Sequence, residues 1–405
     1  MRPRAVRLVA AVCAVVGACS GPASGGVAAL HVRDSRYLVP GGVAGSPRGR
    51  LLAARAVPGR DPTLGSARRW EILYESRDVA GRGIAVSGLV LVPRGVQPHG
   101  GWRAVAWAHG TTGLADRCAP SLAADLGHDA SAVREVRSLL AHGFAVVATD
   151  YPGLGTPGVH PYLVGHANAA AVVDAVTAAH QLLPGRITRA WATVGHSEGG
   201  ETALFTAQDA ARIAPQWPYV GTVALAPAST LEALVPLAQA TADPVEQAYA
   251  LYAVAGLGVV DPAVHLSSLV APAARRFLPD LATGCVDDVT NDLTAHPVGH
   301  VFVGDPVAMS RVSAELGRDD DPDRARWNAP TLVLQGLADE DVPAPATAAM
   351  VGRLCRLGVP LEYRTYPGLD HEGVVTSSLD AVARWVADRF AGVPFDTTCP
   401  GPGPG

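Results

Sequence analysis

The sequence predicts an α/β protein, in which a mostly parallel central sheet is covered by helices on both faces and carries one helical insertion. Short segments that are apolar throughout alternate with longer segments of helical pattern, as expected for a sheet buried on both sides. This alternation stops near residue 228 and resumes at residue 331. The residues between them, 229–325, contain Ala- and Leu-rich helical stretches broken by prolines, so we expect them to form a helical cap on the core.

The core elements follow from apolar runs and their stop signals. Strands are expected at 70–77, 83–93, 103–109, 144–150, 190–196, 219–227, 331–336 and 361–366. Helices are expected at 131–143, 167–183, 201–213, 344–357 and 377–390, the first of them ending at a glycine. These elements place the α/β core at 70–228 and 326–399.

The N-terminus has the pattern of an export signal. In residues 1–25, a basic start is followed by an apolar run that is too short to span a bilayer but suits the apolar part of a signal peptide. The run ends at Cys19, which resembles the lipidated residue of a bacterial lipoprotein, and ordinary secretion fits the preceding small residues equally well. Residues 26–69 are expected to be a tether and an irregular segment, and the tail 400–405 is expected to be disordered.

The composition excludes several classes of function. Hydrophobic residues make up 48% of the 405 residues, which suits a globular protein rather than a disordered one. The net charge is −5 and no basic stripe is present, so no nucleic-acid partner is expected. The segment 153–158 fits the dinucleotide pattern G-x-G-x-x-G, but Pro152 and Pro157 indicate a rigid loop where a helix should begin. No cofactor is expected, and because no C-x-x-C pair occurs, neither is a zinc site. The acidic run at 319–323 lacks the glycine and distal glutamate of a calcium loop, so we expect a solvated linker and no metal site there.

The cysteine count fits an exported protein. Of 6 cysteines, Cys13 lies in the signal and Cys19 at its end. An even number remains, which permits three pairings in an oxidising compartment. These residues are Cys118, Cys285, Cys355 and Cys399.

The stretch "GHSEGG" places one serine between close glycines. Gly195, Ser197 and Gly199 fit the pattern G-x-S-x-G, with a predicted strand before it and a predicted helix after it. A turn sharp enough to lift the serine oxygen above the sheet leaves no space for a Cβ two residues away on either side. We therefore expect Ser197 to be a nucleophile.

A serine nucleophile needs a histidine base and an acid that orients it, in the chain order Ser, acid, His. Of 13 histidines, only His371 lies after residue 300. The loop "LADEDVP" after a predicted strand offers the acid, and Asp339 is favoured because it is closest to the strand end. Asp341 remains an alternative, although it suits the cap of a helix that starts near Pro343. Asp370 and Glu372 flank His371 and are expected to be solvated loop acids.

The oxyanion formed during acyl transfer needs backbone N–H donors. One donor is expected from Glu198, directly after the serine, whose carboxylate is expected only to cap the helix start. The second is expected from the loop "HGTTG" after an early strand, with Thr111 preferred and Thr112 as the alternative.

With these motifs assembled, the chain resembles the secretory lipase (lipase A-like) family of the α/β-hydrolase superfamily, in its actinobacterial type. The matching stretches are "GRGIAVSGLVLVP", "AWAHGTTGLADRCAPSL", "ATDYPGLGTPGVHPYL", "GHSEGG", "QGLADEDVP" and "YPGLDHEG". The resemblance implies the α/β-hydrolase fold and an exported ester hydrolase that acts on acylglycerols without a cofactor. It also implies a triad of Ser197, Asp339 and His371, an acyl pocket under the cap, and the pairs Cys118–Cys285 and Cys355–Cys399. Cys19 departs from the family pattern and leaves open whether the protein is free or anchored to the envelope.

The sequence thus predicts a serine carboxylic ester hydrolase. An acyltransferase or peptidase of the cell envelope would use the same three residues. An envelope binding protein would carry them without turnover. The apolar side chains of the cap fit an acyl pocket, but they also fit plain packing.

Overall fold

The computed structural model describes residues 37, 39, 43, 47–59, 62–65, 67–127, 129–303, 306–319 and 321–399. The expected signal at 1–25 with its Cys19, and the expected disordered tail at 400–405, lie outside the described residues.

One sheet runs through the described part of the chain, with the strand order β1-β2-β3-β5-β4-β6-β7-β8-β9. Its strands are β1 (Leu51–Val57), β2 (Arg68–Arg77), β3 (Gly83–Val92), β4 (Trp102–Ala108), β5 (Phe144–Thr149), β6 (Ile187–His196), β7 (Tyr219–Leu225), β8 (Thr331–Gly336) and β9 (Leu361–Tyr366). The six strands β4 to β9 pair in parallel with one another, whereas β1, β2 and β3 are antiparallel additions at one edge of the sheet. The mostly parallel sheet predicted from the uniformly apolar runs is therefore present, and β5 and β8 are buried along their whole length.

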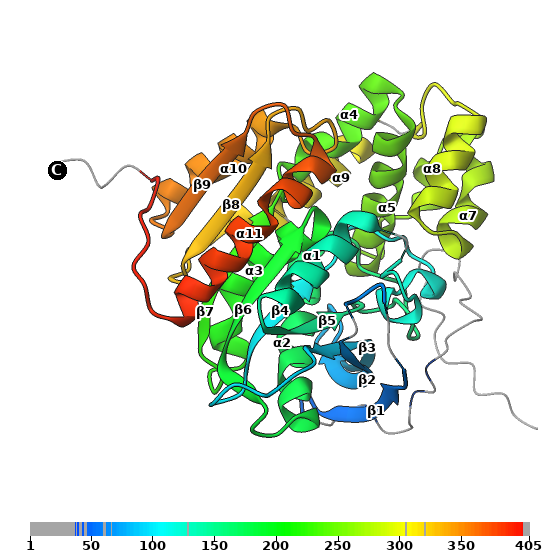
Figure 1. The fold of residues 1–405 in the computed structure, drawn as a ribbon. Helices are drawn as coiled ribbons and strands as arrows, with labels where there is room; N and C mark the ends of the chain where they lie inside the picture. The colour runs from blue at the N-terminus through cyan, green and yellow to red at the C-terminus, as the bar shows by residue number, and fades with distance from the viewer. Residues whose placement is uncertain are drawn as a thin grey trace, which may run out of the picture.

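Helices cover both faces of this sheet (Figure 1). On one face, α1 (Ala130–Ala141) packs beside α11 (His371–Phe390), and both contribute to one apolar cluster with the strands. On the other face, α2 (Gly165–Leu182), α3 (Glu198–Ile213) and α10 (Ala344–Arg356) bury their apolar sides. This arrangement brings the carboxyl ends of the parallel strands to one edge, where binding sites of α/β proteins form.

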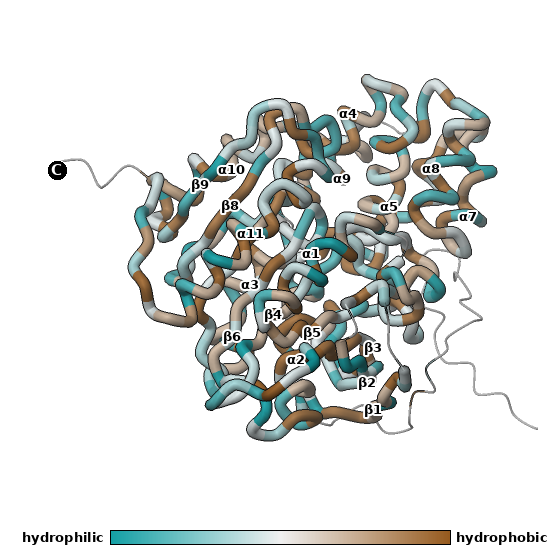
Figure 2. The backbone as a smooth tube through the Cα atoms, viewed as in Figure 1, coloured by the Kyte–Doolittle hydropathy of each residue, from teal (hydrophilic) through white to brown (hydrophobic). Residues whose placement is uncertain are grey.

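The segment between β7 and β8 holds the cap helices. They are α4 (Leu234–Thr241), α5 (Pro244–Val260), α6 (Leu266–Leu269), α7 (Leu278–Thr283), α8 (Val286–Ala295) and α9 (Pro306–Asp319). Figure 1 shows α4, α5, α7 and α8 gathered at one end of the molecule. In Figure 2, brown and teal stretches alternate along α7 and α8, as expected for helices with one buried face. The central helix α5 is buried along most of its length, and the cap has an apolar core of its own.

Three expectations from the sequence are wrong at this level. The segment expected to be irregular contains β1, an edge strand whose mostly exposed residues lack the pattern of a buried strand. The last helix begins at His371 instead of residue 377, because Asp370 accepts a hydrogen bond from Gly373 N (2.7 Å) and caps it, so Asp370 is not merely a solvated loop acid. In the acidic run expected to be a solvated linker, Asp321 and Asp323 are buried, and Asp321 accepts a hydrogen bond from Leu231 N (2.9 Å).

Candidate active site

Ser197 lies in the sharp turn between β6 and α3. Its φ of 59° and ψ of −121° place it in a region that residues with a Cβ rarely occupy. Two hydrogen bonds hold this turn: Ser197 N donates to Leu225 O (2.9 Å) and Ala228 N donates to Ser197 O (3.1 Å). The strained backbone is thus fixed by the neighbouring strand, and Ser197 lines a cavity.

The two glycines around Ser197 have no space for a side chain. A Cβ on Gly195 would lie 2.1 Å from Gly199 O, and one on Gly199 would lie 2.0 Å from Ala108 O. The end of β6, the start of α3 and the end of β4 therefore touch through their backbones. This is the packing reason expected for the pattern G-x-S-x-G.

His371 is the first residue of α11, and a hydrogen bond to Asp339 fixes the orientation of its ring. Its Nδ1–H donates to Asp339 Oδ2 at 2.9 Å, with both side chains almost fully buried. The other ring nitrogen, Nε2, has no hydrogen-bond partner among the described residues and is available to accept a proton. Burial opposes the charged imidazolium, but the hydrogen bond and the charge of Asp339 outweigh it and raise the pKa of His371 above its ordinary value.

His196 connects this histidine to the serine turn. Its Nε2–H donates to the backbone oxygen of His371 at 3.1 Å, and the centroids of the two rings are 4.4 Å apart. Burial and the neighbouring His371 lower the pKa of His196 well below its ordinary value, so it stays neutral. Since His196 directly precedes Ser197, this contact places the start of α11 beside the nucleophile turn.

Asp339 lies in the loop after β8 and is held by several donors. Oδ1 accepts from Asp341 N (3.1 Å) and Val342 N (2.8 Å), and Oδ2 also accepts from Gln335 Nε2 (2.9 Å). Of the two acids left open by the sequence, Asp339 is the one that contacts His371, whereas Asp341 lines the cavity. The expected helix cap by Asp341 is wrong, since α10 begins at Ala344 without a side-chain cap.

Sequence reasoning missed the residue behind this loop. Gln335, at the end of the buried strand β8, donates to Asp339 and accepts from Thr347 Oγ1 at 2.7 Å. A polar side chain in the otherwise apolar run "TLVLQG" was the available signal.

The loop 109–113 lies against the serine turn. A Cβ on Gly110 would lie 3.6 Å from Ser197 Cβ. The neighbouring Thr111 shares a hydrogen bond of 2.8 Å between its Oγ1 and Tyr162 Oη. The carbonyl of Thr112, the alternative donor, accepts from Val286 N of the cap at 2.9 Å. The candidate donor Thr111 therefore directly follows the glycine on which a side chain would reach Ser197.

Glu198 begins α3, so its backbone N–H has no partner within the helix. Its carboxylate does not cap the helix as expected, because Oε1 lies 2.8 Å from Nε2 of His160, with both side chains 1% exposed. The Nδ1–H of His160 donates to Pro152 O at 3.1 Å, so His160 joins this loop carbonyl to Glu198 through one buried ring. The sequence had not singled out His160, whose partner is distant along the chain.

A cavity lies between the core and the cap, and its space free of protein atoms, solvent at its mouth included, is about 650 Å³. Its wall is mostly apolar, with a few polar side chains and the carboxyl groups of Glu246 and Asp341. The lining residues are Tyr162, Leu163, Ser197, Ala228, Ser229, Thr230, Leu231, Ala233, Leu234, Leu237, Glu246, Tyr249, Asp341, Val342, Pro343 and Ala346. A small organic group that enters this cavity meets Ser197.

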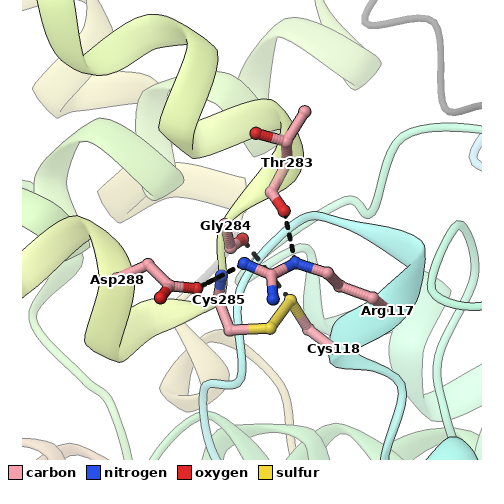
Figure 3. The surroundings of a disulfide bond; sticks show 6 residues. All are labelled: Arg117, Cys118, Thr283, Gly284, Cys285 and Asp288. Carbon is pink, nitrogen blue, oxygen red and sulfur yellow. Dashed lines mark hydrogen bonds and ion pairs between the residues drawn. A yellow bond between two sulfur atoms is a disulfide. The ribbon is translucent and has the colours of Figure 1, made fainter.

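The structure pairs the cysteines as the family resemblance implies. Cys118 is bonded to Cys285, and Cys355 to Cys399, with Cα–Cα distances of 5.5 and 5.2 Å. Figure 3 shows Arg117 beside the first bond, pointing toward Asp288 and the carbonyl oxygen of Thr283, which it contacts. This bond therefore joins the loop after β4 to the start of α8 in the cap.

Within the described residues, no group of His, Cys, Asp and Glu is arranged to hold a metal ion. In the same part of the chain, no helix combines the length and the apolar character needed to cross a membrane.

Comparison with known proteins gives a consistent result. The secretory lipase family model matches residues 130–397. Lipase A of Arthroderma benhamiae is 22% identical over 393 residues, covering 90% of this chain and 81% of that protein. Candida antarctica lipase A superposes with a TM-score of 0.76 at 19% identity, over 90% of this chain and 87% of the other. The rice cell wall degrading esterase LipA from Xanthomonas oryzae reaches 0.69 at 20% identity, over 85% and 98% of the two chains.

Proposed function

Because the chain belongs to the secretory lipase family, has the α/β-hydrolase fold and is a carboxylic ester hydrolase of lipid esters, we propose that it cleaves acylglycerol-type esters with a triad of Ser197, His371 and Asp339. The observation that carries this proposal is the buried His371–Asp339 hydrogen bond, which lies beside the turn that holds Ser197. His196 joins the serine turn to His371, and His371 in turn donates to Asp339 (3.1 and 2.9 Å).

The first half of the reaction forms an acyl-enzyme. Ser197 Oγ attacks the ester carbonyl carbon while His371 Nε2 takes the hydroxyl proton. The carbonyl oxygen becomes an oxyanion, which the backbone N–H groups of Glu198 and Thr111 stabilise. The C–O bond to the alcohol then breaks, and His371 gives its proton to the leaving alcohol oxygen.

The second half releases the acid. Water gives a proton to His371 Nε2 as its oxygen attacks the acyl carbon, and collapse of the second oxyanion returns the proton to Ser197 Oγ. The charge of Asp339 stabilises the imidazolium in both halves, and its hydrogen bond keeps the proton of the free enzyme on Nδ1.

The cap and the export route are parts of the same proposal. The segment 229–325 acts as a cover over the cavity at Ser197, with an apolar wall suited to an acyl chain. Residues 1–25 direct export, either as a freely secreted protein or through lipidation of Cys19. The secretory family and the two disulfides support an exported protein.

Replacement of Ser197 by Ala tests the proposal. Turnover of p-nitrophenyl esters and labelling by a fluorophosphonate probe should both be lost, while the melting temperature stays near that of the wild type. Residual activity within about tenfold of the wild type would contradict the assignment, since loss of a triad residue costs several orders of magnitude.

The same assay separates the alternatives. Cleavage of amide substrates at rates comparable to esters would indicate a peptidase, and transfer to added alcohols in preference to water would indicate an acyltransferase. A wild-type protein that neither reacts with the probe nor turns over any ester would be a binding protein.

A further inference from the structure

One side chain of the cap carries a carboxyl group into a cavity whose wall is otherwise mostly apolar. Glu246 of α5 lines the cavity together with Ser197, yet the residue is only 6% exposed. Its Oε2 is buried and has no hydrogen-bond partner in the described part of the chain. Because an unsatisfied buried carboxyl oxygen destabilises the fold, its presence at the wall indicates a ligand that satisfies it.

Among the described residues, the positive charge that acts on Glu246 is that of His371 when it is protonated, and it is outweighed by the nearby carboxylates. None of the described residues that line the cavity is Lys, Arg or His, and the other carboxyl group at the wall belongs to Asp341. A further polar atom at the wall, Ser229 Oγ, is also buried without a hydrogen-bond partner among the described residues. The cavity therefore combines apolar side chains for a hydrocarbon with polar atoms that need hydrogen bonds.

The protonation state of Glu246 helps to distinguish a hydroxyl group from an ammonium group as the ligand. Burial, followed by the charges of Asp341 and Asp243, raises its pKa to about 7. At neutral pH the carboxyl group thus exists in both forms. A hydroxyl group can donate to the ionised form and accept from the protonated form, whereas an ammonium group matches only the ionised one.

We propose that Glu246 is a specificity-determining residue that hydrogen-bonds a hydroxyl group of the ester substrate. The enzyme then prefers hydroxylated esters to plain alkyl esters of the same acyl length. This inference rests on the proposed function, since it assigns a substrate class to the cavity at Ser197. The hydroxyl group can belong to the alcohol part, as in a monoacylglycerol, or to the acyl part, as in a hydroxy acid ester.

The test compares kcat/KM for three esters of one acyl length: a monoacylglycerol, a methyl ester and a hydroxyacyl methyl ester. The wild type should favour one hydroxylated ester over the methyl ester. Glu246→Leu should lower that ratio roughly tenfold to hundredfold, the effect of a lost hydrogen bond to a carboxyl group. Glu246→Gln, which still bonds a hydroxyl group, should retain part of the preference. Glu232→Gln, an exposed cap position outside the cavity wall, should leave the ratio unchanged.

Each result has one meaning. The hydroxylated ester whose ratio falls identifies the part of the substrate that Glu246 contacts. An unchanged ratio in Glu246→Leu, or a wild type that hydrolyses all three esters equally, would overturn the inference and leave the proposed function standing. A choline ester of the same acyl length is assayed as a fourth, cationic substrate, and a wild-type preference for it that Glu246→Leu removes would overturn the inference in favour of a cation site. If the wild type hydrolyses no ester and resists the fluorophosphonate probe, the proposed function fails, and this inference fails with it.

Discussion

The carboxylate of Asp339 accepts more hydrogen bonds than the orientation of one histidine requires. Besides His371, its donors are Gln335 Nε2 and the backbone N–H groups of Asp341 and Val342. These contacts fill both oxygens and hold the carboxylate in one position. Asp341, with its side chain at the cavity wall, affects His371 only through its charge.

Asp339→Asn should therefore lower turnover by up to roughly 10⁴-fold, because an amide presents the wrong partner to His371 Nδ1. Asp341→Asn should change turnover by less than about tenfold, since it removes no hydrogen bond to the ring. Steady-state esterase rates and melting temperatures on the same preparations check both. If the two variants exchange these effects, Asp341 is the orienting acid.

The raised pKa of His371 predicts the pH dependence. His371 must be neutral to accept the serine proton, so kcat/KM should rise with pH, with its midpoint above the ordinary histidine value of about 6.5. The nearby charge of Asp341 contributes to the raised pKa, so Asp341→Asn should move the midpoint to lower pH. Glu340→Gln, at an exposed position in the same loop, should leave it unchanged.

The same shift contributes to the stability of the fold. A folded-state pKa above the unfolded one stabilises the fold fully below the unfolded pKa, and this contribution is lost as the pH rises through the folded pKa. For the pH dependence of kcat/KM, a midpoint at or below about 6.5 in the wild type would contradict the position assigned to His371.

At the level of elements, the turn at Ser197 depends on backbone contacts that only glycine permits. Gly199→Ala would place a Cβ 2.0 Å from Ala108 O, so β4 and α3 must separate. We expect a loss of about 1–3 kcal/mol in the free energy of unfolding and a large loss of turnover. Gly352→Ala in α10 is the matched control, because its new Cβ would meet nothing closer than a flexible arginine end at 3.7 Å, and alanine favours a helix. Equal free energies of unfolding of the two variants would show that the turn can accommodate a Cβ at residue 199.

The elements that the sequence predicted well are those whose signals are local. The strand before Ser197 and the helix after it follow from apolar runs and glycines. His160 and Glu246 could not be found in this way, because each matters through neighbours far away in the chain. Gln335 was overlooked although its partner Asp339 is only 4 residues away, and its polar side chain in the run "TLVLQG" was a local signal. Strand β1 was missed since an exposed edge strand has little apolar pattern. The start of α11 was missed because Gly373 lies in its first turn, and glycine is typical of a loop and not of a helix.

At the level of the whole molecule, the cap and the core meet around the loop that contains Thr111. The Cys118–Cys285 bond and the Arg117–Asp288 ion pair join the segment after this loop to the start of α8 (Figure 3). The hydrogen bond from Val286 N to Thr112 O joins the loop itself to α8. The cap is therefore attached directly beside the proposed oxyanion donor. The second disulfide joins α10 to the C-terminal segment, away from Ser197.

The two disulfides allow stability and catalysis to be separated. They close segments with sequence separations of 167 and 44, and chain entropy predicts about 4–5 kcal/mol of stabilisation from each. Cys118→Ser/Cys285→Ser and Cys355→Ser/Cys399→Ser should thus lower the melting temperature to a similar extent. Well below that temperature, only the first pair of substitutions should also lower kcat, by about tenfold or more, because it frees the loop that positions Thr111. Rates and melting curves of both variants check this, with non-reducing peptide maps of the wild type to verify the pairing. Equal kcat values in the two variants would mean that the remaining contacts between the loop and α8 hold the oxyanion donor without the disulfide.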